Sequence, residues 1–192
     1  MPDYRYFSAD ILTGAVLAEL PLYGVWLTRK LSEAGSGTGT LKLGTGNYND
    51  QELLDGTIPG KTALYVERDG TIIWGGIIWS RTWAEDAHNI NLTAQTFESI
   101  FDHVVLEEDF IHQAEDQMQI FKAMIDALQN QTHNNFGLDT STIGTCGVLR
   151  TVLVPHYEYH YASDVADQIV AVEDGIDYTI DTLPGTEVDQ PR

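Results

Sequence analysis

The sequence predicts an α+β protein, with a β-barrel domain at residues 1–106 and a small α+β domain with two helices at residues 107–181. Short alternating strand patterns separated by glycine-containing turns fill the first part. Apolar residues at helical spacing occur only after Leu106. Hydrophobic residues make up 43% of the 192 residues, which is enough to bury a core. Residues 182–192 are polar and form either a tail or the start of a further domain.

The first predicted element is a hairpin. Alternating residues run from Tyr4 to Ile11, Thr13-Gly14 is a turn signal, and Val16–Leu20 forms the return strand. A further strand is predicted at Gly24–Arg29.

The next segment, Gly35–Thr40, consists only of glycine, serine and threonine. This composition is typical of flexible chain, so we expect a long hairpin tip that a neighbouring subunit orders. A phosphate-binding loop is not favoured, because its lysine would have to open a helix. Lys42 lies instead within an alternating strand pattern.

The central hairpin is the clearest β feature. Thr62–Arg68 alternates, Asp69-Gly70 is a strong hairpin turn signal, and Thr71–Trp83 returns. Gly75-Gly76 in the middle of the return strand predicts a bulge or sharp bend. His88–Thr96 pairs next, with Ile90, Leu92 and Ala94 on one face. Bent strands of this kind favour a small barrel or sandwich over a flat sheet.

The pattern changes in the second part. A helix is predicted at Gln113–Thr132, with Asp116 able to cap it. One apolar stripe at helical spacing is predicted on it, formed by Ile120, Phe121, Met124, Ile125 and Leu128. Strands are predicted at Cys146–Val154 and Ile176–Ile180, and Ser163 is expected to cap a second helix in which Val165, Ile169 and Val172 share one face.

Composition restricts the classes of function. Ten Lys and Arg against 29 Asp and Glu give a net charge of −19, which disfavours ordinary binding of nucleic acid. The single cysteine, Cys146, excludes an internal disulfide and is expected to be a small core residue. No apolar run approaches the roughly 20 residues of a membrane span. We expect a chain made in the cytoplasm, without a cofactor and without membrane contact.

One segment has the composition of a metal site. If residues 156–161 extend as a strand, then His156, Glu158 and His160 project to one side, and two histidines with one carboxylate can bind a metal. The alternative is a polar strand face with Tyr157 and Tyr159 directed inward. The alternative is favoured, and no catalytic residue is predicted.

Aromatic residues gather in the central hairpin. We identify Trp74, Trp79, Trp83, Gly75 and Gly76 as interface candidates, since tryptophans beside a bend often anchor protein contacts. The same tryptophans are also able to stack on sugars.

One series of elements runs along the chain: the hairpin Ala63–Ile78, the strand and short turn of helix at Leu92–Phe101, the helix Gln117–Gln129, and the segments Tyr161–Ile169 and Gly175–Ile180. The order of these elements resembles that of phage tail hub proteins, the minor tail proteins of siphophages, especially those of actinobacterial phages.

The resemblance implies a tail-tube-like barrel and a trimeric hub at the distal end of the tail in the virion. Each subunit of the family has two such barrels, so that three subunits form a pseudo-sixfold ring. This chain is expected to contain the first barrel and the α+β insertion, and to stop near the second barrel. The implied partners are distal tail and tail tube proteins, the tape measure protein, other minor tail proteins and passing genomic DNA that is not specifically bound.

Three hypotheses follow. The favoured one is a structural, non-enzymatic hub ring whose acidic lumen lets DNA pass. The second is a carbohydrate-binding or receptor-binding tail module that uses the tryptophans. The third is a metal-dependent hydrolase that uses His156, Glu158 and His160.

Overall fold

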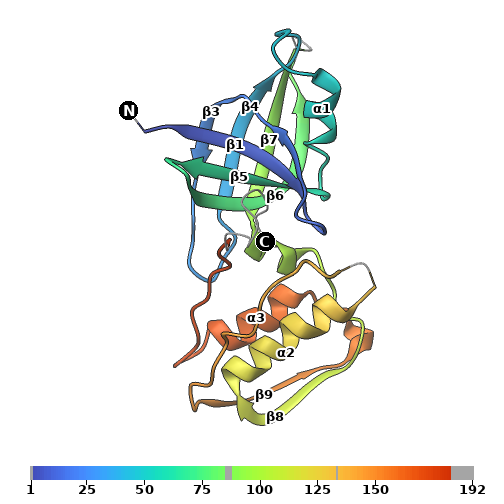
Figure 1. Cartoon of the computed structure of the whole chain (residues 1–192). Helices are drawn as coiled ribbons and strands as arrows, with labels where there is room; N and C mark the ends of the chain where they lie inside the picture. Colours follow the sequence, from blue (N-terminus) through green and yellow to red (C-terminus); the bar gives the residue numbers. More distant parts are fainter. Residues whose placement is uncertain (1, 85–87, 133, 183–192) are drawn as a thin grey trace. The chain divides into compact units, whose positions relative to one another are not determined.

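The computed structural model describes residues 2–84, 88–132 and 134–182, which form two compact units (Figure 1). Unit 1 contains the chain up to Ser99 together with the segment from Thr179, and unit 2 contains Ile100–Tyr178. The predicted α+β class is confirmed by antiparallel strands with few helices. The predicted polar tail, apart from Thr182, lies outside the described residues.

Unit 1 is built on one antiparallel sheet of seven strands in the order β2-β1-β5-β6-β7-β4-β3. The strands are β1 (Tyr4–Asp10), β2 (Val16–Glu19), β3 (Leu22–Leu27), β4 (Ser36–Lys42), β5 (Thr62–Arg68), β6 (Thr71–Trp83) and β7 (Asn89–Thr96). A short helix, α1 (Asp50–Asp55), follows β4, and a 3₁₀ helix, η1 (Phe97–Asp102), follows β7.

The two predicted hairpins are confirmed, and local chemistry explains both turns. Between β1 and β2, the Asp10 carboxylate accepts hydrogen bonds from the backbone N–H groups of Leu12 and Thr13. Between β5 and β6, Asp69 and Gly70 both have positive φ, 52° and 82°. Two consecutive residues with positive φ are what a two-residue hairpin of the type I′ kind requires.

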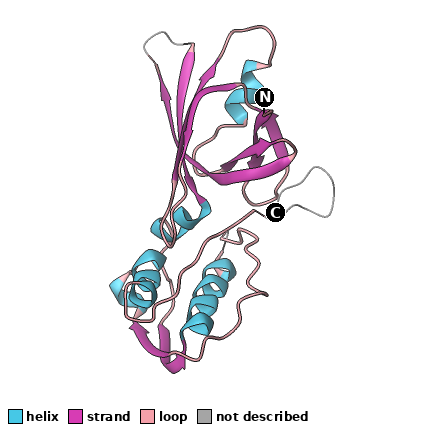
Figure 2. Ribbon diagram, turned by 90° about the vertical axis from the view of Figure 1, so that its left-hand side faces the viewer, coloured by secondary structure: helices cyan, strands magenta, loops and turns pink. Residues whose placement is uncertain are grey.

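The sheet curls strongly but is not a closed barrel. Its two edge strands, β2 and β3, are consecutive in sequence, so Glu19 and Leu22 lie at most about 11 Å apart. A flat sheet of seven strands would hold its edges about 29 Å apart. Figure 2 shows the strands wrapping around rather than lying in one plane. Among the described residues no backbone ladder joins β2 to β3, so the predicted barrel remains open at this seam.

The inner face of the curl holds the core of unit 1. The alternation of Ile90, Leu92 and Ala94 in β7, predicted from the sequence, directs all three inward. Side chains from the other strands and from α1 join them; the cluster includes Ala18, Leu22, Leu41, Leu53, Leu64, Val66, Trp74 and Ile78. One core shared by both halves of the sheet is what keeps the sheet curled.

The prediction of a flexible tip at Gly35–Thr40 was wrong. These residues form most of β4, an inner strand that pairs with β3 on one side and β7 on the other. The glycines serve packing: a Cβ at Gly37 would lie 2.9 Å from the Trp74 ring, and one at Gly39 would lie 3.4 Å from Leu22. Composition predicted flexibility here, but tertiary packing needs a position without a side chain at Gly37, whereas a Cβ at Gly39 would make ordinary contacts.

Gly75 and Gly76 also differ from the prediction, because both pair regularly with β5, opposite Tyr65 and Leu64. The irregularities of β6 lie to either side, in the pairing with β5 before Trp74 and in the pairing with β7 after Ile78. The two glycines instead leave space for neighbouring atoms that a side chain would overlap. A Cβ at Gly76 would lie 2.2 Å from the Gln95 carbonyl oxygen, a distance that no side chain tolerates.

Unit 2 contains a two-stranded antiparallel sheet, β8 (Phe110–Asp116) with β9 (Leu149–Val154), and two helices, α2 (Gln117–Asn130) and α3 (Ala162–Val170) (Figure 1). The predicted apolar stripe of α2 is confirmed, and all five of its residues are buried: Ile120, Phe121, Met124, Ile125 and Leu128. The helix starts later than predicted, because the Asp116 side chain accepts from the Met118 N–H and residues before it belong to β8.

Several predictions for the second half were wrong. Ile176–Ile180 is not a strand; Tyr178 packs instead with its ring centroid 4.7 Å from that of Phe121. Cys146 is exposed rather than in the core. The cap of α3 is Tyr161 rather than Ser163. Val165 and Ile169 are buried as predicted, whereas Val172 follows the helix and is 41% exposed.

Candidate functional site

The segment with His156, Glu158 and His160 is not the predicted strand. After Pro155 the chain forms a 3₁₀ turn, η2 (His156–Glu158), and Tyr159 has a positive φ of 54°. The cause is a contact with a residue distant in the sequence, since Asp109 accepts hydrogen bonds from both the backbone N–H and the ring Nδ1 of His156, at 2.8 and 2.7 Å.

These contacts separate the three candidate metal ligands. His156 pairs with Asp109, whereas His160 contacts Glu158 through Nε2 at 2.9 Å and Asp164 through Nδ1 at 3.4 Å. Hydrogen bonds with Glu158 and then Asp164 raise the pKa of His160. Within the described part of the chain, no three His, Cys, Asp or Glu side chains group as a metal site. Tyr157 and Tyr159 are exposed and do not point inward as predicted.

The tryptophans of the central hairpin occupy three different environments. Trp74 is only 2% exposed and donates its Nε1–H to the Thr28 carbonyl at 3.0 Å. Trp79 is half-buried, and its Nε1–H bonds the Ser99 hydroxyl at 2.8 Å. Trp83 is 51% exposed at the end of β6. Gly75 and Gly76 are buried. Among these interface candidates, therefore, only Trp83 offers a large exposed side chain.

A larger surface lies on the outer face of the sheet, across β3, β4, β7 and β6. The strand registers place eight outward residues in two cross-strand rows: Trp26, Thr38, Thr93 and Ser80, and beside them Tyr23, Thr40, Asn91 and Thr82. We call this set the uncharged face. Seven of the eight residues are exposed and Thr40 is partly buried.

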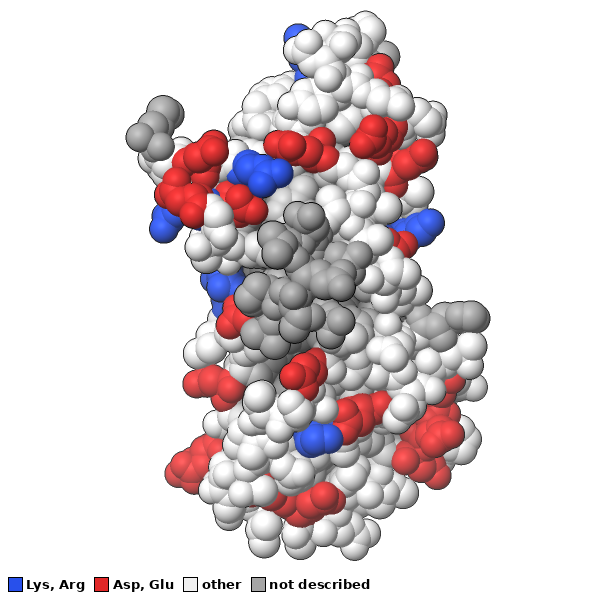
Figure 3. Space-filling model, viewed as in Figure 1, with Lys and Arg blue, Asp and Glu red and all other residues white. Residues whose placement is uncertain are grey.

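The uncharged face combines aromatic rings with hydroxyl and amide groups. Trp26 and Tyr23 are 59% and 49% exposed on the edge strand β3. The Tyr23 hydroxyl donates to the Asn89 side chain, and the Thr40 hydroxyl donates to that of Asn91, each at 3.0 Å. None of the eight residues carries a charge, although the chain has a net charge of −19. Figure 3 shows Asp and Glu spread over both units on the face in view.

Unit 2 has its own exposed apolar surface on the two-stranded sheet β8–β9. Ile111 and Leu153 lie opposite each other in the ladder and are 54% and 56% exposed. Leu149, further along β9, is 61% exposed. The neighbouring pair Phe110 and Val154 is buried. A two-stranded sheet that is apolar on both faces, with one face buried, has the other face available for a partner.

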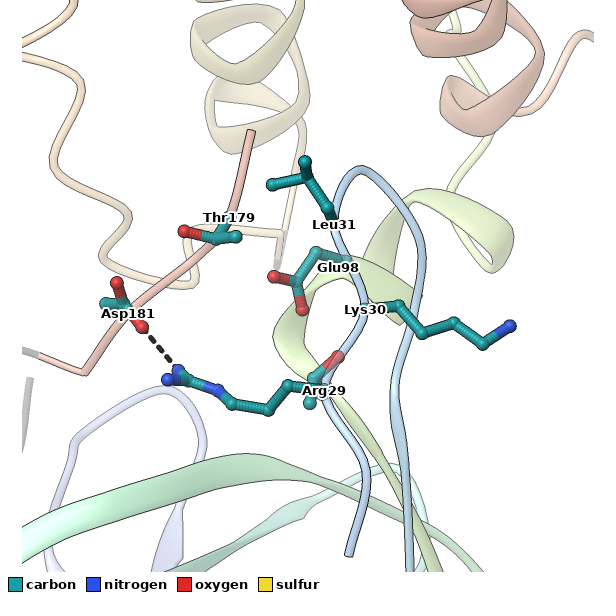
Figure 4. Close-up of a pocket in the computed structure, with 7 residues that line it drawn as sticks. Arg29, Lys30, Leu31, Glu98, Thr179 and Asp181 are labelled. Carbon is teal, nitrogen blue, oxygen red and sulfur yellow. Dashed lines mark hydrogen bonds and ion pairs between the residues drawn. The ribbon is translucent and has the colours of Figure 1, made fainter. Parts of the chain in front are cut away.

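Unit 1 also contains a cavity of about 260 Å³ beside the segment that joins β3 to β4 (Figure 4). Its lining consists of Arg29, Lys30, Leu31, Thr96, Glu98, Thr179 and Asp181. Arg29 and Asp181 form an ion pair across it. Glu98, on η1, is 6% exposed.

Comparison of the sequence with protein-family models and with curated proteins gives no match. The solved structures that are similar to the chain include two tail proteins. The tail protein from Neisseria meningitidis MC58 has a TM-score of 0.35 and 12% identity, over 66% of this chain and 29% of that chain. The 43 kDa tail protein of prophage MuSo2 from Shewanella oneidensis has a TM-score of 0.48 and 12% identity, over 85% of this chain and 48% of that chain. The chain therefore spans less than half the length of either protein.

Sequence reasoning missed the uncharged face. The signal was present in the alternation of Thr38, Thr40, Asn91 and Thr93, but the strand that carries the first two was predicted as a loop. No helix in the described residues is both long and apolar enough to cross a membrane.

Proposed function

We propose that this chain is a structural component of a phage tail tip, where copies assemble into a trimeric hub ring that closes or extends the tail tube. The assignment to tails rests on the order of elements in the sequence. The observation that supports assembly is the uncharged face on the outside of unit 1.

Electrostatics favour this face as the contact between copies. Chains with a net charge of −19 repel one another, so two copies meet at least cost where their surfaces carry no charge. Exposed Tyr and Trp are the residues most often found as anchors of protein interfaces. Tyr23 and Trp26 are exposed on the edge strand β3, where a second chain can also pair with the backbone.

The remaining surface suits a channel through which DNA passes. Carboxylates around a lumen do not bind phosphates, because contact releases no counterions from the DNA. In this proposal the ring lies at the distal end of the tail in the virion. It contacts tail tube and distal tail proteins, the tape measure protein and other minor tail proteins, and it catalyses no reaction.

The test is to place a charge in the uncharged face. Thr93→Glu puts a carboxylate between Thr38 and Ser80 without disturbing the core. Multi-angle light scattering over a range of concentrations, and cryo-electron microscopy of assembled particles, report the number of copies. We expect the wild-type chain to form trimers and Thr93→Glu to remain monomeric.

Thr71→Glu provides the matched control, because Thr71 is exposed on the same strand as Ser80 but lies outside the face. It should assemble as the wild type does. A wild-type chain that stays monomeric at all concentrations and in particles, or a Thr93→Glu variant that assembles normally, would contradict the proposal.

Carbohydrate binding is the second candidate function, and the uncharged face also favours it. Sugars stack on exposed aromatic rings and bond to hydroxyl and amide groups, and Trp26 lies in one row with Thr38 and Thr93. Trp79, the residue first considered for this role, is half-buried and bonded to Ser99. Binding on a glycan array that is lost in Trp26→Ala but kept in Trp83→Ala would favour this function over the ring.

A further inference from the structure

We propose that the cavity beside the β3–β4 connection binds an organic cation, an ammonium or guanidinium group, through the buried carboxylate of Glu98. This inference does not depend on the proposed ring, since every residue that carries it lies in unit 1.

Only one of the two carboxylate oxygens of Glu98 has a hydrogen-bond partner among the described residues. One carboxylate oxygen, Oε1, accepts the backbone N–H of Ile180 at 2.8 Å. The other, Oε2, is buried and has no hydrogen-bond partner among the described residues. The residue is 6% exposed and lines the cavity. A buried carboxylate oxygen is rarely left without a donor, so its position in a cavity wall points to a donor from outside the chain.

Neither of the two basic residues that line the cavity, Arg29 and Lys30, bonds to Oε2 of Glu98. Arg29 pairs with Asp181, and Figure 4 shows its side chain extending toward that carboxylate. Lys30 pairs with Glu33 at 2.8 Å, and its side chain points away from Glu98 in the same view. Each of these cations is matched by a carboxylate other than Glu98. The negative charge of Glu98 is therefore the one left uncompensated among the described lining residues.

The shape and lining fit an organic cation better than a metal ion. A hard divalent ion needs several oxygen ligands, whereas Asp181 is already paired with Arg29, whose charge would repel the ion. An alkylammonium or guanidinium group donates directly to Oε2, and Leu31 provides an apolar wall for its carbon chain. A volume of about 260 Å³ accommodates a group of this size.

Two sources can supply the same group: a free amine, or a Lys or Arg side chain from a neighbouring chain in an assembly. Both donate an N–H to the same oxygen. The experiment therefore has one arm for each source.

The first arm titrates the full chain with n-butylamine and with methylguanidinium, followed by the NMR shift of the Ile180 amide, which bonds the same carboxylate. We expect saturable shifts in the wild-type chain and at least tenfold weaker binding in Glu98→Gln. The glutamine oxygen can still accept from Ile180, so the fold is retained. The exposed Glu107→Gln is the matched control and should bind like the wild type.

The second arm treats assembled particles with a carbodiimide, which joins a carboxylate to a lysine in direct contact with it, and maps the products by mass spectrometry. A cross-link from Glu98 that disappears in Glu98→Gln identifies a neighbouring lysine as the source. Saturable amine binding without such a cross-link identifies a free amine or an arginine. The inference is overturned if neither arm gives a Glu98-dependent signal, or if Ca²⁺ or Mn²⁺ binds at Glu98 and the amines do not.

Discussion

The indole ring of Trp74 fills the space that a side chain at Gly37 would need. A Cβ at Gly37 would come within 2.9 Å of the ring, which is itself 2% exposed. The ring also donates its N–H to the carbonyl of Thr28, in the connection between β3 and β4. This one contact ties the central hairpin to β4, and β4 carries two of the eight residues of the uncharged face, Thr38 and Thr40.

Gly37→Ala should therefore destabilise unit 1. The added methyl group has to displace the Trp74 ring from a packed core, which costs about 1–3 kcal/mol in comparable cases. Urea denaturation followed by tryptophan fluorescence measures the change in the free energy of unfolding. Gly144→Ala is the control, since nothing lies within 4 Å of a Cβ at that position. Equal stabilities of the two variants would show that the ring has room to move.

The hydroxyl of Tyr65 should ionise at a higher pH than the hydroxyls of the exposed tyrosines. Burial raises its pKa to about 12, and its ring stacks on Phe7 with the centroids 5.4 Å apart. The folded pKa exceeds the unfolded value of 10.0, so the neutral hydroxyl of Tyr65 contributes to the stability of the fold. This contribution is complete below pH 10 and is lost as the pH rises toward 12. Two pKa units correspond to about 3 kcal/mol. Ultraviolet titration of tyrosinate should show a late component that is missing in Tyr65→Phe; a Tyr65 that ionises with the exposed tyrosines contradicts this.

His160 should remain protonated to a higher pH than an ordinary histidine. Glu158 and Asp164 stabilise the imidazolium, so the folded pKa lies above the ordinary histidine value of 6.5. The contribution to stability is complete below pH 6.5 and disappears as the pH rises through the folded pKa. NMR titration should show the raised pKa, and Glu158→Gln should lower it, whereas Glu108→Gln should not.

The same titration tests the metal hypothesis. If His156, Glu158 and His160 bound a metal together, Zn²⁺ would shift the pKa of His160 strongly downward, because a metal and a proton compete for one ring nitrogen. With His156 paired to Asp109, we expect the titration of His160 to be unchanged by equimolar Zn²⁺.

Leu153→Glu separates assembly from stability in unit 2. Leu153 is exposed, so the change should alter the free energy of unfolding by less than about 0.5 kcal/mol. The adjacent Val152 is 2% exposed, and Val152→Ala should cost about 2 kcal/mol. Pull-down of the chain with purified tail assemblies should weaken in Leu153→Glu and persist in Val152→Ala. The opposite pattern would mean that the apolar face of β8–β9 has no partner.

Local signals predicted much of the fold. The Asp69-Gly70 turn, β5 and the alternation of β7 follow from residue spacing and turn chemistry, which act over a few neighbouring residues. The buried stripe of α2, with Met124 and Leu128, follows for the same reason. The candidate sites were predicted less well, because they depend on which strands become neighbours.

Residue spacing and composition were sufficient to predict the α+β class, the order of the main strands and the two helices, and the acidity that disfavours binding to nucleic acid. The three-dimensional fold was needed to find that Gly37 and Gly39 lie inside a sheet, that Trp74 is a core residue, and that His156 turns toward Asp109. Each of these outcomes depends on a partner far away along the chain. A glycine is flexible in isolation, but it becomes the required residue where a distant ring must pack against the backbone.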